Sequence, residues 1–115
     1  MRLALAALSS LLSIGALSIA QGAPDVQGVT LTLKGHRFTP DVVEVRAGAR
    51  IRIDLINQDP ATEEFDSEDL HVEKDVTPNG KVSFVIGPLA AGTYGFMGEL
   101  HPETAKGTIR AVAAP

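Results

Sequence analysis

Most of the negative charge of this 115-residue chain lies in one segment, residues 59–75. Eight of the chain's 14 acidic residues fall there, whereas Lys74 is its only full positive charge and His71 its only imidazole. Carboxylates this close together repel one another unless a cation lies among them. Phe65 and Leu70 interrupt the charges, and we expect them to anchor the segment to the core. A solvated polar loop is the plain alternative, but anchored carboxylates favour a site for a hard or borderline metal ion.

Residues 94–103 offer a second set of metal-ligating groups, at the expected end of a strand. Met97 supplies a thioether, Glu99 and Glu103 supply carboxylates, and His101 supplies an imidazole. A Glu-x-His arrangement is common without a metal, so this loop alone leaves open a surface histidine and a methionine that covers an apolar edge. The two segments together are the places where metal chemistry is expected.

Composition excludes several other chemistries. The chain contains no Cys, which excludes disulfides, a thiolate nucleophile, Cys-ligated zinc, iron–sulfur clusters and thiolate-bound blue copper. A net charge of −4 with four Phe, one Tyr and no Trp argues against nucleic acid as a partner. No Ser lies in a Gly-x-Ser-x-Gly motif, which argues against a hydrolase.

The N-terminus has the features of a secretory signal. Arg2 precedes an uncharged run, residues 3–20, that ends on small residues at the two positions that a signal peptidase reads, Ser18 and Ala20. A retained anchor helix is the alternative, because the run approaches the length that spans a bilayer, but its serines weaken that interpretation. We therefore expect residues 1–20 to be a cleaved signal peptide and residues 21–115 to be one periplasmic domain.

The remaining chain is predicted to be a small antiparallel β-sandwich. No stretch keeps a helical period for ten residues, and turn signals separate the short segments. Polar and apolar residues alternate in six of these segments, residues 29–34, 41–46, 50–57, 82–86, 93–98 and 107–112. The alternation stops after Asn57, so the acidic segment is expected to be a loop.

Several motifs, in this order, resemble those of a cupredoxin. They are EEF at 63–65, PNGK at 78–81, PLAAGTYGF at 88–96, LHP at 100–102 and GTI at 107–109. The resemblance covers residues 29–112 and implies an all-β, cupredoxin-like Greek-key β-sandwich. In that family one early His, then a Cys, a later His and a Met hold type 1 copper.

The family's copper ligands are mostly missing from this chain. The resemblance places the late His at His101, but it places the Cys at Gly98, the Met near Ala105, and the early His in the region of Glu63 and Glu64. It therefore implies a cupredoxin fold without a type 1 copper centre.

A narrower resemblance concerns residues 63–74, whose sequence is EEFDSEDLHVEK. This run is similar to that of EfeO-type domains and small periplasmic cupredoxins that accompany oxidase-dependent iron permeases. The similarity implies a metal-binding component of bacterial iron uptake, which binds an iron or copper ion and assists iron oxidation or delivery to an inner-membrane permease. Companion periplasmic or membrane redox proteins are the further expected partners, and no enzymatic activity of its own is expected beyond an accessory role in iron oxidation.

This function requires both segments to contribute metal ligands at one end of the sandwich. Carboxylates and imidazole suit iron, Cu(II) or Zn(II), whereas a thioether prefers Cu(I). A periplasmic copper or zinc carrier and a metal-free interaction module are the alternatives. The expected ligands are Glu63, Glu64, Asp66, Met97, Glu99 and His101.

Three other titratable residues are assigned to different roles. We expect Glu73 to pair with an arginine, with Arg46, Arg50 and Arg52 as candidates, because adjacent strand residues point to opposite faces. His36 and His71 are expected to be surface residues.

Overall fold

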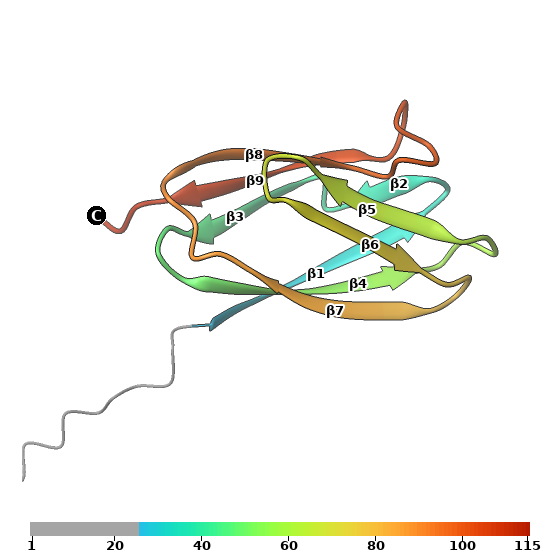
Figure 1. Cartoon of the computed structure of the whole chain (residues 1–115), viewed down its shortest axis with the longest axis horizontal. Coiled ribbons are helices and arrows are strands. Elements are labelled where there is room, and N and C mark those ends of the chain that lie inside the picture. Colours follow the sequence, from blue (N-terminus) through green and yellow to red (C-terminus); the bar gives the residue numbers. More distant parts are fainter. Residues whose placement is uncertain (1–25) are drawn as a thin grey trace, which may run out of the picture.

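The computed structural model describes residues 26–115, which form two β-sheets stacked as a sandwich (Figure 1). The predicted signal peptide, residues 1–20, and the first five residues of the predicted mature domain lie outside the described residues. Within residues 26–115 every regular element is a strand. No helix in this part of the chain is long and apolar enough to cross a membrane.

One sheet has four strands in the order β2-β1-β4-β7. β1 and β2 form a hairpin, and β4 pairs with β7 in the antiparallel sense. β1 and β4 run parallel from Val26 opposite Arg50 to Leu33 opposite Asn57. The strands are β1 (Val26–Lys34), β2 (Arg37–Thr39), β4 (Arg50–Asn57) and β7 (Lys81–Ile86).

The other sheet has five strands in the order β3-β9-β8-β5-β6. β3 runs parallel to β9, whereas the remaining neighbours are antiparallel. These strands are β3 (Val42–Arg46), β5 (Glu63–Ser67), β6 (Val72–Val76), β8 (Gly92–Met97) and β9 (Lys106–Val112). The prediction of an all-β Greek-key sandwich is confirmed. The strand pattern predicted an antiparallel sandwich, and two of its pairs, β1–β4 and β3–β9, are instead parallel, because the chain leaves the first sheet to form β3 and then returns to pair β4 alongside β1.

The core fills the space between the two sheets with the apolar residues of each alternating strand. Leu31, Ile53 and Leu55 are fully buried, as the alternation predicted. Phe65 is fully buried too, and its ring stacks on that of Phe96 with centroids 5.0 Å apart. The expectation that Phe65 anchors the acidic segment is therefore confirmed.

The acidic segment is a β-hairpin and not the loop that we expected. β5 and β6 pair from Glu63 opposite Val76 to Ser67 opposite Val72. The alternation was hidden because the inward positions of β5 include the buried polar side chains of Glu63 and Ser67. The hairpin turn is tied to β8 by two hydrogen bonds: Ser67 Oγ donates to the Gly95 carbonyl at 2.6 Å, and Gly95 N–H donates to a carboxylate oxygen of Asp69 at 2.8 Å.

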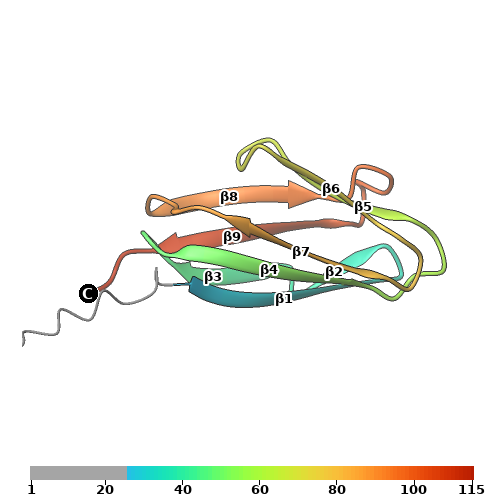
Figure 2. The ribbon, with the colours of Figure 1, turned by 60° about the horizontal axis from the view of Figure 1, so that its bottom comes forward.

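One end of the sandwich gathers three segments that are far apart in the sequence. The β1–β2 turn, the start of β5 and the loop between β8 and β9 all lie at the end opposite the C-terminus (Figure 1). The view of Figure 2 shows the same three segments at the same end, across the edges of both layers.

Candidate metal centre

Three side chains, one from each segment, meet at this end. His36 lies in the β1–β2 turn, Glu63 begins β5, and His101 lies in the loop after β8. The Nδ1 atom of His36 is 2.7 Å from Glu63 Oε1, and the Nδ1 atom of His101 is 3.4 Å from Glu63 Oε2. One potential ligand atom from each of the three lies within 4.8 Å of the others. We call this group the inner site.

The inner site combines a buried charge with accessible imidazoles. The Glu63 side chain is fully buried, whereas the side chains of His36 and His101 are 43% and 31% exposed. The two rings stack with their centroids 3.6 Å apart and their planes at 21°. A buried carboxylate is costly unless it is paired or hydrogen-bonded, so the two imidazoles, or a metal ion held with them, compensate for the burial of Glu63.

The β1–β2 turn fixes the position of His36. Gly35 and His36 both have positive φ, 59° and 56°, as the two central residues of a type I′ hairpin turn require. The Asp59 carboxylate accepts hydrogen bonds from the N–H groups of Gly35 at 2.7 Å and His36 at 3.0 Å. Burial alone would raise the pKa of Asp59, but these two backbone hydrogen bonds lower it below its usual value. The ionised carboxylate therefore holds the turn.

Asn57 in turn fixes Asp59. The Asn57 side chain is buried, and its Oδ1 accepts a hydrogen bond from Asp59 N–H at 2.9 Å. Its amide nitrogen donates to the carbonyls of Ala61 at 2.8 Å and Thr77 at 3.0 Å. This single side chain therefore connects the end of β4, the entry to β5 and the exit from β6.

The loop that carries His101 is closed on itself. Gly98 N–H donates to the Ala105 carbonyl at 2.8 Å, and Ala105 N–H donates to the His101 carbonyl at 2.8 Å. A Cβ atom at Gly98 would lie 2.9 Å from the Ala105 Cβ and 3.1 Å from the Glu64 carbonyl oxygen. The position at which the cupredoxin resemblance places a Cys therefore has no room for a side chain.

A second cluster, which we call the outer cluster, consists of Glu64, Asp66 and Glu99. One potential ligand atom from each lies within 4.8 Å of the others. Successive strand residues point to opposite faces, so Glu64 and Asp66 lie on the outer face of β5 while Glu63 and Phe65 lie on the inner face. The outer cluster is thus separated from the inner site by the backbone of β5.

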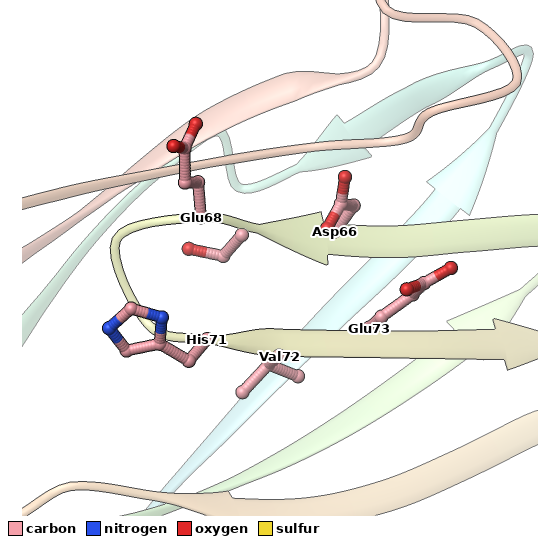
Figure 3. Close-up of a pocket in the computed structure, with 6 residues that line it drawn as sticks. Asp66, Glu68, His71, Val72 and Glu73 are labelled. Atoms are coloured by element: carbon pink, nitrogen blue, oxygen red, sulfur yellow. The ribbon is translucent and has the colours of Figure 1, made fainter.

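Two further side chains flank the outer cluster. Asp66 lies opposite Met97 on β8 and opposite Glu73 on β6. Asp66 and Glu73 project from neighbouring strands into the same open pocket of about 410 Å³, with His71 at the hairpin turn (Figure 3). His71 is exposed, as expected.

Glu64 is the most perturbed acid of the outer cluster. Its side chain is only 7% exposed, and among the described residues its Oε1 atom has no hydrogen-bond partner. Burial, followed by the carboxyl groups of Glu99 and Glu73, raises the pKa of Glu64 to about 7. Glu73, which we expected to pair with an arginine, therefore lies against another acid.

The structure divides the six predicted ligands between two places. Glu63 and His101 belong to the inner site. The other four, Glu64, Asp66, Met97 and Glu99, lie in or beside the outer cluster. The sequence interpretation missed His36 as a site residue, although Gly35-His36 between two short extended segments was a signal for a two-residue turn that would carry the imidazole to this end.

Comparisons with known proteins agree with this architecture. An uncharacterized protein of Rickettsia prowazekii, RP394, is 42% identical over 81 residues, which cover 70% of this chain and 65% of that relative's length. The Cu(I)-bound metal-binding domain of the Cu(I)-exporting P-type ATPase CopA of Streptococcus pneumoniae superposes with a TM-score of 0.66 at 13% identity, covering 79% of this chain and 99% of that one. Auracyanin A, a blue copper protein of Chloroflexus aurantiacus, gives a TM-score of 0.67 at 14% identity, covering 76% and 100%.

These two structural similarities show a shared fold. The family assignment comes from the model of the cupredoxin-like domain, which matches residues 3–111. The chain therefore belongs to the cupredoxin-like domain family.

Proposed function

We propose that this protein is a periplasmic metal-binding component of bacterial iron uptake, which binds an iron or copper ion at the inner site and assists iron oxidation or delivery to a membrane permease. The observation that carries the proposal is the fully buried Glu63 carboxylate, which lies against two partly exposed imidazoles. Such an arrangement offers a buried negative charge and two nitrogen donors to an ion that arrives from solvent.

The donor set fits the proposed ions. Two histidines and one carboxylate are typical of non-haem Fe(II) sites, and imidazole also suits Cu(II) and Zn(II). The chain has no Cys, and the Gly98 backbone is too tightly packed for a side chain, so a type 1 copper centre does not fit. His36, Glu63 and His101 would hold the ion, which would supply redox or Lewis-acid chemistry when bound.

Iron is favoured by the resemblance of residues 63–74 to EfeO-type domains, and the periplasm by the predicted signal peptide. A periplasmic copper or zinc carrier is the second candidate. The copper named for CopA and for auracyanin A supports it, as does the half-exposed thioether of Met97.

Equilibrium dialysis of the purified protein against Fe(II) under anaerobic conditions, Fe(III) citrate, Cu(II) and Zn(II) tests this function. We expect the inner site to bind one equivalent of iron, whether or not it also binds copper, with affinity reduced at least about tenfold in both His36→Ala and His101→Ala. His71→Ala is the matched control, because it removes an imidazole from the opposite end of the β5–β6 hairpin and should leave the affinity unchanged.

Three results separate the alternatives. Preferential binding of Cu(II) or Zn(II) with no iron binding would favour the carrier. Stoichiometric binding of no ion would leave a metal-free interaction module. Unchanged affinity in both His36→Ala and His101→Ala would move the site elsewhere.

A further inference from the structure

We propose that the outer face of the β5–β6 hairpin carries a second cation site, built from Glu64, Asp66 and Glu99 and selective for a hard, oxygen-preferring ion. The proposal concerns a site separate from the inner one. Only its connection to iron rests on the proposed function; the existence of the site does not.

The two sites cannot share their ligands, because β5 separates them. Glu63 and Glu64 are neighbours in the sequence, and the alternation of the strand sends their side chains to opposite faces. Glu99, two residues before His101, brings its carboxylate to the outer cluster while His101 reaches Glu63 on the inner side. Each face therefore has its own group of three potential ligands.

Within residues 26–115, no cationic side chain accompanies the buried Glu64 carboxyl. A carboxylate oxygen that is buried without a hydrogen bond destabilises the fold unless something compensates for it. The groups that interact with Glu64 are the carboxyls of Glu99 and Glu73, which are acids themselves. Lys74 lies opposite Phe65 in the hairpin register and so belongs to the other face. A bound cation would satisfy both the buried oxygen and the converging carboxylates.

The donor atoms determine the class of ion. Three carboxylates offer only oxygen, which suits hard cations such as Fe(III), Mn(II) and Ca²⁺ better than copper. The thioether of Met97, opposite Asp66, is a soft group beside the cluster. Within the proposed function, the outer site is thus suited to Fe(III) and the inner site to Fe(II) or copper.

The outer face also gives an ion a way in. Asp66 is partly exposed and lines two open pockets, one shared with Glu73 on the β6 side (Figure 3) and one shared with Met97 on the β8 side. Glu99 is exposed at the end of β8. Two of the three carboxylates of the outer cluster, those of Asp66 and Glu99, are therefore open to solvent.

Titration with Mn(II), followed by the loss of its free-ion electron paramagnetic resonance signal, tests the second site. The inner site is first disabled by Glu63→Gln, which keeps the shape of the buried side chain without its charge, and the titration is done at pH 8. We expect this variant to keep one equivalent of Mn(II). Adding Glu99→Gln or Asp66→Asn should weaken Mn(II) binding at least about tenfold. Glu44→Gln is the matched control, because it removes one exposed carboxylate from β3, at the far edge of the same sheet.

Two kinds of result would overturn the outer site. Absence of Mn(II) binding would overturn the proposal and leave Glu64 neutralised by a proton alone. The proposal would also be overturned if neither Glu99→Gln nor Asp66→Asn weakened Mn(II) binding. The same holds if Glu44→Gln weakened Mn(II) binding as much as those two variants do. The inner site is judged separately, from nitrogen hyperfine structure in the Cu(II) spectrum of the wild type and of Glu99→Gln. Either site can therefore fail without the other, and both carboxylate variants change exposed or partly exposed residues that leave the core intact.

Discussion

Each face of β5 carries a buried glutamate, but the two glutamates have opposite surroundings. Glu63 and Glu64 are both buried, but Glu63 lies against two stacked imidazoles whereas Glu64 lies among other carboxylates. Burial alone therefore does not determine whether a carboxylate can take part in a metal site, or for which ion. The groups that the neighbouring segments bring to each face decide whether the site offers nitrogen and oxygen donors or oxygen alone.

The two faces also differ in how firmly they are held. A chain of hydrogen bonds from Asn57 through Asp59 to the turn of His36 positions the inner site. The outer cluster combines one buried side chain, Glu64, with the exposed Glu99 at the end of a strand. The inner site is therefore preorganised, whereas the outer cluster can adapt to the ion that it binds.

The largest expected effect is that of Glu63→Gln on the inner site. The substitution keeps the shape of the side chain but removes the buried carboxylate that contacts both imidazoles. We expect Cu(II) affinity, measured by competition with a chromophoric chelator, to fall about 100-fold or more, since even partners of a ligand are worth 10–100-fold. Mn(II) binding at the outer cluster should not change. A loss of both would show that the two faces act as one site.

Gly98→Cys should disturb both faces at once. The new Cβ would meet the Ala105 Cβ at 2.9 Å and the Glu64 carbonyl oxygen at 3.1 Å, and these atoms belong to a tightly closed loop and to β5. We expect a loss of about 1–3 kcal/mol in the free energy of unfolding, measured by urea denaturation. No intense blue thiolate-to-copper absorption should appear. A Gly98→Cys protein that is both stable and blue would contradict the close packing described for this loop.

Asp59→Ala is expected to weaken the inner site alone. It removes the acceptor for the N–H groups of Gly35 and His36, so the turn no longer holds the imidazole in place. We expect about a tenfold loss of Cu(II) affinity, as for other residues that orient a ligand. Asp59→Asn keeps one carbonyl oxygen and should recover part of that loss. Equal losses of Cu(II) and Mn(II) binding would instead indicate general destabilisation.

The sequence predicted the sandwich because most strands bury one face with apolar residues. Ile51, Ile53 and Leu55 alternate with polar residues and are all fully buried. The same rule failed at β5, where Glu63 occupies an inward position. The interactions that make a buried glutamate tolerable come from His36 and His101, at sequence separations of 27 and 38 residues, and no local pattern contains them.

The sequence predicted which residue types could bind a metal better than it predicted which of these residues meet in space. The residue types at 63, 64, 66, 99 and 101 indicated metal ligands, but a loop at 59–75 would have allowed all of them to converge. Because the segment is a hairpin, strand alternation separates Glu63 from Glu64. The assignment of His36 depended on recognising a type I′ turn at Gly35-His36, whose Asp59 partner lies more than 20 residues away.

The smallest expected effect concerns pH and the outer face. Burial raises the pKa of Glu64 from 4.5 to about 7, so the folded protein holds this proton more tightly than the unfolded chain does. Its contribution to stability is complete below pH 4.5 and disappears as the pH rises through about 7. Without metal, Glu64→Gln should therefore match the wild type near pH 4.5 and exceed its Tm by a few degrees at pH 8. Thermal unfolding followed by circular dichroism measures this difference.

Mn(II) distinguishes the two ways of neutralising Glu64. At pH 8 the added ion should raise the Tm of the wild type, because it binds the folded outer cluster, and should raise that of Glu64→Gln much less. Glu44→Gln should follow the wild type at both pH values. If Glu64→Gln and the wild type instead keep the same difference in Tm from pH 4.5 to pH 8, Glu64 is already ionised across that range. The outer face would then tolerate its buried carboxylate without either a proton or a cation, and the contrast between the two faces of β5 would lose its electrostatic basis.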